Sequence, residues 1–269
     1  MKPGEGKIVF RFVATTLALL MAVSLAVGQA RADDVYFLTT SNSSENLAVE
    51  NLLAARGITV TVGPNYTTFA GPVPAGTNAV VLLGNDSSTG APMTTGGQNA
   101  LLSFIKSGGG LVTGEWTIWG NAHEGYDPIL APVFPVVPSS LYNYNSPITY
   151  SQATANAVLD SGLPSSFTFT ADSNGGTETY FQPKVGATVY FNSSYGSGVI
   201  GWKYGSGRVI SLSTLAGTTE LGDPHYARLF GNSANWAAGV VPAPSTYLGL
   251  LSLGGTGILG YIWRRRRRS

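Results

Sequence analysis

The C-terminal 29 residues constrain how the rest of the chain folds, because they combine three segments that belong at a membrane and not inside a compact domain. The segments are a proline-led stretch, an uncharged run and an arginine cluster. They comprise Val241, Pro242, Ala243 and Pro244; residues 247–263; and Arg264, Arg265, Arg266, Arg267 and Arg268. As a helix at ~1.5 Å per residue, the uncharged run spans roughly 26 Å, just short of a bilayer core. We expect it to form a transmembrane helix, with the arginines cytoplasmic and the preceding chain outside.

This order of segments resembles the PEP-CTERM sorting signal of exported bacterial proteins, on which a membrane protease-transpeptidase called exosortase acts. The resemblance implies export across the inner membrane, an exosortase-type enzyme as partner, and bacteria that make exopolysaccharide, which makes an exopolysaccharide partner an expectation. The glutamate that the family usually has between the prolines is Ala243 here. A plain C-terminal membrane anchor that is not processed is the alternative.

The N-terminus has the features of a signal peptide. Three basic residues precede an uncharged run over 12–27, and Ala30 and Ala32 place small residues at the two positions that a signal peptidase reads. We expect cleavage after Ala32, with an uncleaved N-terminal anchor as the alternative. The predicted division of the chain is a signal peptide over 1–32, an exported α/β domain over 33–240 and the sorting signal over 241–269.

Composition narrows the functions open to the exported domain. Residues 33–240 contain six basic and thirteen acidic residues, which gives a formal charge near −7. An acidic domain repels phosphate backbones, so we expect no nucleic-acid partner. The chain has no cysteine, which excludes disulfides, thiolate metal sites and a cysteine nucleophile. We expect neither a metal nor a cofactor.

The first half of this domain alternates between strand-like and helix-like segments. Residues 34–39, 58–62, 79–83 and 111–113 are β-branched or apolar runs, while Asn42 and Thr95 begin stretches with capping spacing and helical periodicity. This alternation is typical of a parallel sheet covered by helices. Later, 199–204 and 208–213 have the pattern of a hairpin, and 224–238 that of a closing helix.

Four stretches resemble the class I glutamine amidotransferase-like superfamily, in particular its trehalose-utilisation-like branch. They are SGGGLV at 107–112, LDSGLP at 159–164, YGSGRVI at 204–210 and LFGNSANWAAG at 229–239. The resemblance implies a flavodoxin-like, doubly wound fold with a mostly parallel sheet. The superfamily's amidotransferases have a cysteine where the chain leaves the strand at 111–113. Here that region has Glu115 and the chain has no cysteine, so glutamine amidotransfer is excluded.

Three residues are candidates for catalysis. Glu115 follows a predicted strand at the edge where open α/β sheets bind ligands. His123 and His225 each lie beside an acid, and could serve as general base or metal ligand. However, Asp223 fits equally well as the cap of the closing helix. If Glu115 is buried without a cationic partner, its pKa should be raised.

The periodic pattern breaks down over 117–147, as in a lid or a surface insertion. This region is rich in aromatic residues, which suit sugar rings but can equally well cover the edge of the sheet. They include Trp119, Tyr126, Tyr142 and Tyr144, with Trp116 directly before the region. We expect a surface-targeted envelope protein whose domain binds or structures a partner. The competing hypothesis is a carbohydrate hydrolase that uses Glu115 with a histidine.

Overall fold

The computed structural model describes residues 34–84, 91–137, 139, 141–172 and 177–239. The predicted signal peptide with Ala30 and Ala32, the motif from Val241 to Pro244, the helix over 247–263 and the arginine cluster all lie outside these residues. Within the described ranges, every helix is too short or too polar to cross a bilayer.

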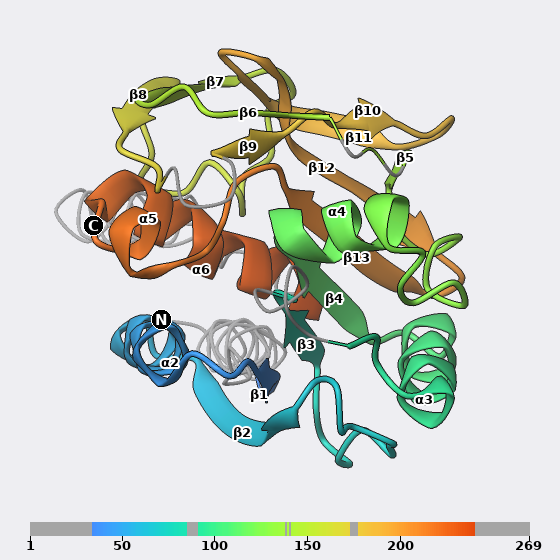
Figure 1. Ribbon diagram of the computed structural model, residues 1–269. Coiled ribbons are helices and arrows are strands. Elements are labelled where there is room, and N and C mark those ends of the chain that lie inside the picture. The colour runs from blue at the N-terminus through green and yellow to red at the C-terminus, as the bar shows by residue number, and fades with distance from the viewer. Residues whose placement is uncertain (1–33, 85–90, 138, 140, 173–176, 240–269) are drawn as a thin grey trace, which may run out of the picture. The chain divides into compact units, whose positions relative to one another are not determined.

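A nine-stranded mixed sheet forms the centre of the domain (Figure 1). In spatial order its strands are β2 (Thr59–Asn65), β1 (Asp34–Thr39), β3 (Ala79–Leu82), β4 (Gly110–Thr113), β13 (Gly207–Leu212), β12 (Gly196–Tyr204), β11 (Thr188–Ser193), β7 (Ile148–Gln152) and β8 (Ser166–Phe169). The first five strands in this order pair in parallel, and the pairings from β13 to β8 are antiparallel. The parallel half confirms the prediction of an α/β fold built on a parallel sheet.

Shorter elements complete the described domain. The helices are α2 (Ser43–Ala55), α3 (Thr95–Lys106), α4 (Glu115–His123), α5 (Thr218–Leu221) and α6 (Pro224–Ala238). Two small sheets pair β10 (Gln182–Pro183) with β5 (Val136–Val137), and β6 (Tyr142–Asn143) with β9 (Glu178–Thr179).

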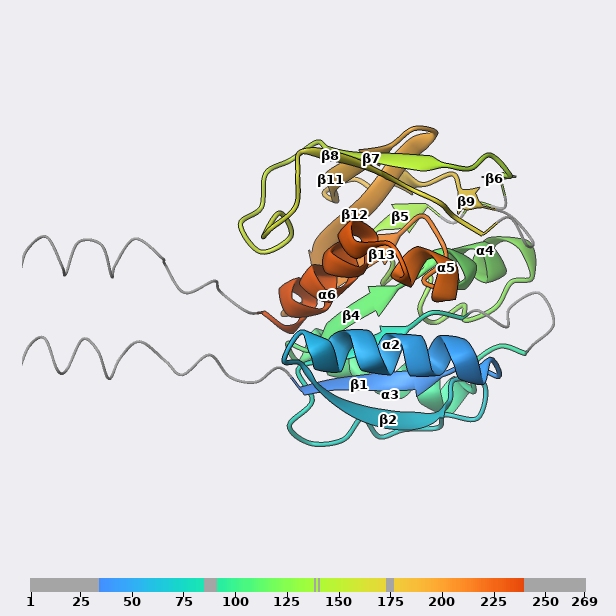
Figure 2. The same ribbon diagram turned by 90° about the vertical axis from the view of Figure 1, so that its left-hand side faces the viewer.

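Helices cover both faces of the parallel half, which makes the fold doubly wound. Side chains alternate along β1: Val35 and Phe37 pack with α2 and α6, whereas Tyr36 and Leu38 pack with α3 and α4. Figure 2 shows α2 and α6 on the face toward the viewer. Because strands of this kind are buried on both faces, they are continuous apolar runs in the sequence. All four residues of β3 are buried for this reason.

The helix ends follow the predicted capping chemistry with one shift. The Asn42 side chain accepts hydrogen bonds from the backbone N–H groups of Ser44 and Glu45 and caps α2. Asp223 caps α6 in the same way. The prediction of Thr95 as a cap is wrong by one residue, because the cap of α3 is Thr94, whose hydroxyl accepts from the backbone N–H of Gly97.

Several parts of the fold were not evident in the sequence, among them α4 and the strands β7 and β8. The stretch predicted to be irregular from residue 117 contains most of α4, a helix buried on several sides and so without an apolar stripe. The strands β7 and β8 were not predicted either. Their exposed faces carry hydroxyl pairs, Thr149 with Thr168 and Ser151 with Ser166, at 2.8 and 2.9 Å, a composition that is typical of loops.

Candidate functional site

The candidate site lies where β4 and β13 end. These strands are parallel neighbours, so their carboxyl ends meet at one edge, the usual place for ligands in an open α/β sheet. Glu115 follows β4 as the first residue of α4, and Ser213 and Thr214 follow β13. The Glu115 backbone N–H donates to the Thr214 carbonyl at 3.4 Å, which joins the two strand ends.

The short strand β9 covers this edge and lies next to α4 (Figure 1). The backbone N–H of Thr179 donates to the Ser213 carbonyl at 2.9 Å, and the Thr179 hydroxyl donates to Glu115 Oε1 at 2.9 Å. Both Glu178 and Thr179 are buried. β9 therefore contributes polar side chains to the site and also closes it from solvent.

Three glutamates, Glu115, Glu178 and Glu220, are buried here with exposed fractions of 2%, 1% and 0%. We call them the glutamate cluster. Glu178 accepts hydrogen bonds from the Ser213 hydroxyl at 2.5 Å and the Asn143 amide at 3.3 Å. Neither ion pair found among the described residues includes a member of the cluster.

Glu220 is held by backbone groups at the end of the four-residue helix α5. Its two carboxyl oxygens accept from the N–H groups of Gly217 at 3.1 Å and Asp172 at 2.5 Å. The contact with Gly217 closes the first turn of α5. Glu220 thus has a structural role, because it joins the start of α5 to the backbone at Asp172.

Burial dominates the electrostatics of the cluster. It raises the pKa of Glu115 to about 8, against a hydrogen bond from Thr179, and the negative charges of Glu178 and Glu220 raise it further. Burial also raises the pKa of Glu178 and of Glu220. Glu115 Oε2 has no hydrogen-bond partner within the described part of the chain. At neutral pH Glu115 is therefore mostly protonated.

Two buried tyrosines extend the network behind the glutamates. The Tyr150 hydroxyl lies 3.0 Å from Ser213 Oγ and 3.1 Å from Thr214 Oγ1, and the Tyr226 hydroxyl donates to the Leu215 carbonyl at 2.9 Å. Burial raises the pKa of both tyrosines, so they remain neutral donors. Such a network holds the strand ends in one arrangement.

The structure does not bring either histidine into contact with Glu115 through any described hydrogen bond or ion pair. His123 is the last residue of α4, eight positions from Glu115, or roughly 12 Å along the helix axis. Its Nε2 lies 3.7 Å from Glu124 Oε1, and its ring packs at a tilt against that of Trp119, with the ring centroids 4.5 Å apart. His225 lies 4.0 Å from Asp223, and its ring contacts that of Phe167 at 5.6 Å.

The aromatic residues of this region divide into two groups. Trp116 is buried, and its ring contacts that of Trp119 at 5.1 Å. By contrast, a group of exposed side chains, which we call the tyrosine surface, lies on β6 and directly beside β6 and β9. It comprises Leu141, Tyr142, Tyr144 and Tyr180, which are 68%, 39%, 58% and 37% exposed. The rings of Tyr142 and Tyr144 meet edge to face at 5.0 Å, and the Tyr180 N–H donates to the Leu141 carbonyl.

Sequence reasoning identified Glu115 but missed Glu178, Glu220, Tyr150 and Tyr226. Only Glu220 had a local signal, because a glutamate three residues after the N-cap residue, here Gly217, can accept from that residue's backbone N–H. Metal binding finds no support in the described residues, where no three His, Cys, Asp or Glu side chains are grouped so as to hold an ion.

Solved structures share this fold. A ThuA-like protein of Parabacteroides merdae superposes with a TM-score of 0.58 at 13% identity, over 79% of this chain and 92% of its own. A cytoplasmic protein of Salmonella typhimurium gives 0.57 at 13% identity, over 76% and 99%. A glutamine amidotransferase of Thermotoga maritima gives 0.50 at 12% identity, over 78% and 99%. These likenesses show a mixed α/β fold with a large central sheet, which is consistent with the predicted flavodoxin-like class, and they carry no statement about activity.

The C-terminus is similar to a known sorting signal. Residues 240–267 match the family model of the PEP-CTERM protein-sorting motif, which confirms that resemblance. The motif indicates an exported protein with membrane-associated sorting by an exosortase-type enzyme. No curated protein has a sequence that matches this chain.

Proposed function

We propose that this exosortase-sorted protein acts at the bacterial cell surface or in the extracellular matrix, where its α/β domain binds or structures an exopolysaccharide without turning it over. The proposal includes removal of residues 1–32, membrane insertion of residues 247–263 and retention of Arg264 to Arg268 in the cytoplasm until the tail is processed.

The tyrosine surface is the observation that carries the binding hypothesis. Exposed aromatic side chains are costly in water, and their faces and hydroxyl groups suit the apolar faces and hydroxyls of sugar rings. The neighbouring Glu115 is sealed behind Thr179, and neither histidine is paired with it. Because the tyrosine surface is exposed and the carboxyl group of Glu115 is buried, this domain is better suited to bind a polysaccharide than to hydrolyse it.

A hydrolase remains the second candidate because of Glu115 itself. A carboxyl with a pKa of about 8 and an unpartnered Oε2 has the protonation state of a general acid at neutral pH. Hydrolysis would require β9 to move and expose Glu115. Release of reducing ends from exopolysaccharide by the parent, with loss in Glu115→Gln, would support this candidate.

The binding hypothesis is tested with exopolysaccharide isolated from the producing organism. Affinity electrophoresis would compare the parent with a Tyr144→Ala, Tyr180→Ala double variant. Leu47→Ala is the matched control, because Leu47 is 56% exposed on α2, outside the tyrosine surface. We expect the double variant to bind at least about tenfold more weakly and the control to bind like the parent. Equal retention of all three proteins would refute the proposal.

A further inference from the structure

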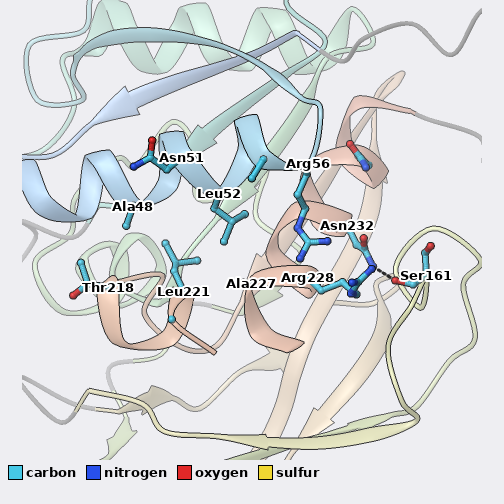
Figure 3. A pocket seen from close by; sticks show the side chains of 13 residues that line it. Ala48, Asn51, Leu52, Arg56, Ser161, Thr218, Leu221, Ala227, Arg228 and Asn232 are labelled. Atoms are coloured by element: carbon cyan, nitrogen blue, oxygen red, sulfur yellow. Dashed lines mark hydrogen bonds between the residues drawn. The ribbon is translucent and has the colours of Figure 1, made fainter. Parts of the chain in front are cut away.

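A cavity of about 800 Å³ opens among α2, α5, α6 and the segment that contains Ser161. Two arginines, Arg56 and Arg228, contribute their side chains to it (Figure 3), and we call it the arginine cavity. Its lining includes no member of the glutamate cluster and no residue of the tyrosine surface. It is therefore a separate feature of the fold.

The side chain of each arginine packs against a glycine. Arg56 caps the C-terminal end of α2, and a Cβ placed on Gly231 of α6 would lie 2.4 Å from Arg56 Cδ. Arg228 projects from α6, and a Cβ on Gly162 would lie 2.6 Å from its Nη1. Larger residues at these two positions would displace the guanidinium groups. The sequence thus leaves room for both arginines to reach the cavity.

Neither arginine has an anionic partner among the described residues. The two ion pairs found there involve other groups, and no hydrogen bond of either guanidinium occurs in that part of the chain. This is unexpected in a domain with thirteen acidic and only six basic residues. Only one oxygen of Asp160, next to Ser161, is engaged: Oδ2 accepts from the Gln152 amide and the Asn156 N–H at 2.6 Å each, whereas the buried Oδ1 has no hydrogen-bond partner among the described residues. Neither oxygen forms an ion pair with Arg56 or Arg228.

The two positive charges also oppose each other. Partial burial lowers the pKa of Arg56, and the charge of Arg228 lowers it further. Two guanidinium groups held together without a counter-ion are unfavourable for the fold, and an oxyanion between them would remove the repulsion. The planar guanidinium group makes two parallel hydrogen bonds to a pair of oxygens of a carboxylate or phosphate group.

The other walls are suited to a small molecule. The Asn232 amide donates to the Ser161 carbonyl at 3.0 Å (Figure 3) and to the Leu159 carbonyl at 2.9 Å, which fixes the segment at residues 159–161 against α6. Leu52 and Leu221 supply apolar surface, and Asn51 adds a polar side chain. The volume lies within the range of small-molecule sites. An oxyanion at the arginines would leave space for a body of several more atoms.

We propose that the arginine cavity binds a small molecule through a carboxylate or phosphate group held between Arg56 and Arg228. The proposal does not depend on the function proposed for the tyrosine surface. Carboxylate and phosphate ligands share this recognition chemistry, and titration separates them.

The test is calorimetric titration of the mature protein, purified from the cells that produce it. The probes are inorganic phosphate, acetate and glucuronate, with sodium chloride as the control for ionic strength. The variants are Arg56→Gln and Arg228→Gln, alone and together. Lys106→Gln is the matched control, because it removes the same charge from an exposed position on α3, on the other face of the sheet.

We expect at least one oxyanion to bind the parent in a saturable manner. Phosphate alone would identify a phosphate group, and acetate or glucuronate a carboxylate. Each single arginine variant should weaken binding at least about tenfold, while Lys106→Gln binds like the parent. Arg56→Lys, which keeps the charge but not the paired donors, controls for folding and should bind with intermediate affinity. The proposal fails if no oxyanion saturates the parent, or if the double arginine variant binds as tightly as Lys106→Gln.

Discussion

The raised pKa of Glu115 predicts that the domain loses stability as pH rises. Glu115 has a pKa of about 8 in the folded domain and an ordinary value of 4.5. Between these values the folded state holds a proton that the unfolded state has released. The stabilisation is therefore fully present below pH 4.5 and is lost as pH rises through about 8. From pH 5 to pH 8, the proton linkage amounts to roughly 3–4 kcal/mol in the free energy of unfolding.

The substitution Glu115→Gln isolates this contribution. Glutamine has a similar shape, stays neutral at every pH and can still accept the hydrogen bond from Thr179. We expect the parent to lose about 3 kcal/mol or more between pH 5 and pH 8, with Glu178 and Glu220 contributing in the same direction because their pKa values are also raised. The variant should show a markedly smaller loss and exceed the parent in stability at pH 8.

Urea unfolding followed by tryptophan fluorescence at several pH values gives the free energy of unfolding against pH for the parent and for Glu115→Gln, and the two slopes are then compared. Glu50→Gln is the matched control, because Glu50 lies on α2, is only partly buried and belongs to neither ion pair found among the described residues. Its slope should equal that of the parent. The reasoning is refuted if the parent is equally stable at pH 5 and pH 8, or if Glu115→Gln leaves the slope unchanged.

Three further predictions concern the fold and the tail. Asp223→Ala removes the side-chain cap of α6 and should cost about 1 kcal/mol in urea unfolding, whereas Asp223→Asn keeps an acceptor and should cost less. Gly110→Ala should destabilise the fold by more than about 2 kcal/mol, because the added Cβ would lie within 2.4 Å of the Ala237 carbonyl carbon. An insoluble variant or a much lower melting temperature would agree with this prediction, and an unchanged melting temperature would contradict it. Mass spectrometry of the mature protein should find a C-terminus near Pro244 without the arginines, whereas intact Arg264 to Arg268 in surface material would indicate a plain anchor.

The parallel half of the fold was predictable because its signals are local. Burial on both faces makes β1 and β3 continuous apolar runs, and the caps at Asn42 and Asp223 each act within three residues. The one-residue error at Thr94 has a local cause as well. Thr94 and Thr95 are adjacent, and spacing alone does not show which hydroxyl meets the free N–H groups.

The glutamate cluster was only partly predictable, because its contacts join distant segments. The position of Glu115 after a parallel strand follows from the strand pattern, and the expected rise in its pKa is confirmed. However, Thr179 is 64 residues from Glu115, Glu178 is 35 from Ser213, and Asp172 is 48 from Glu220. These pairs depend on how the antiparallel half folds back over the strand ends. No periodicity within a single segment encodes that arrangement.

Burial also changes the charge that the domain presents to its partners. The formal value near −7 counts all thirteen acidic residues of 33–240 as ionised, but a carboxyl with a pKa of about 8 is roughly nine-tenths protonated at pH 7. The domain is therefore less acidic than its composition suggests. Its net charge is still negative, so we still expect no nucleic-acid partner. The same field repels small oxyanions at long range. An anion in the arginine cavity must then be held by direct contact with Arg56 and Arg228, so added salt should weaken the long-range repulsion without abolishing binding.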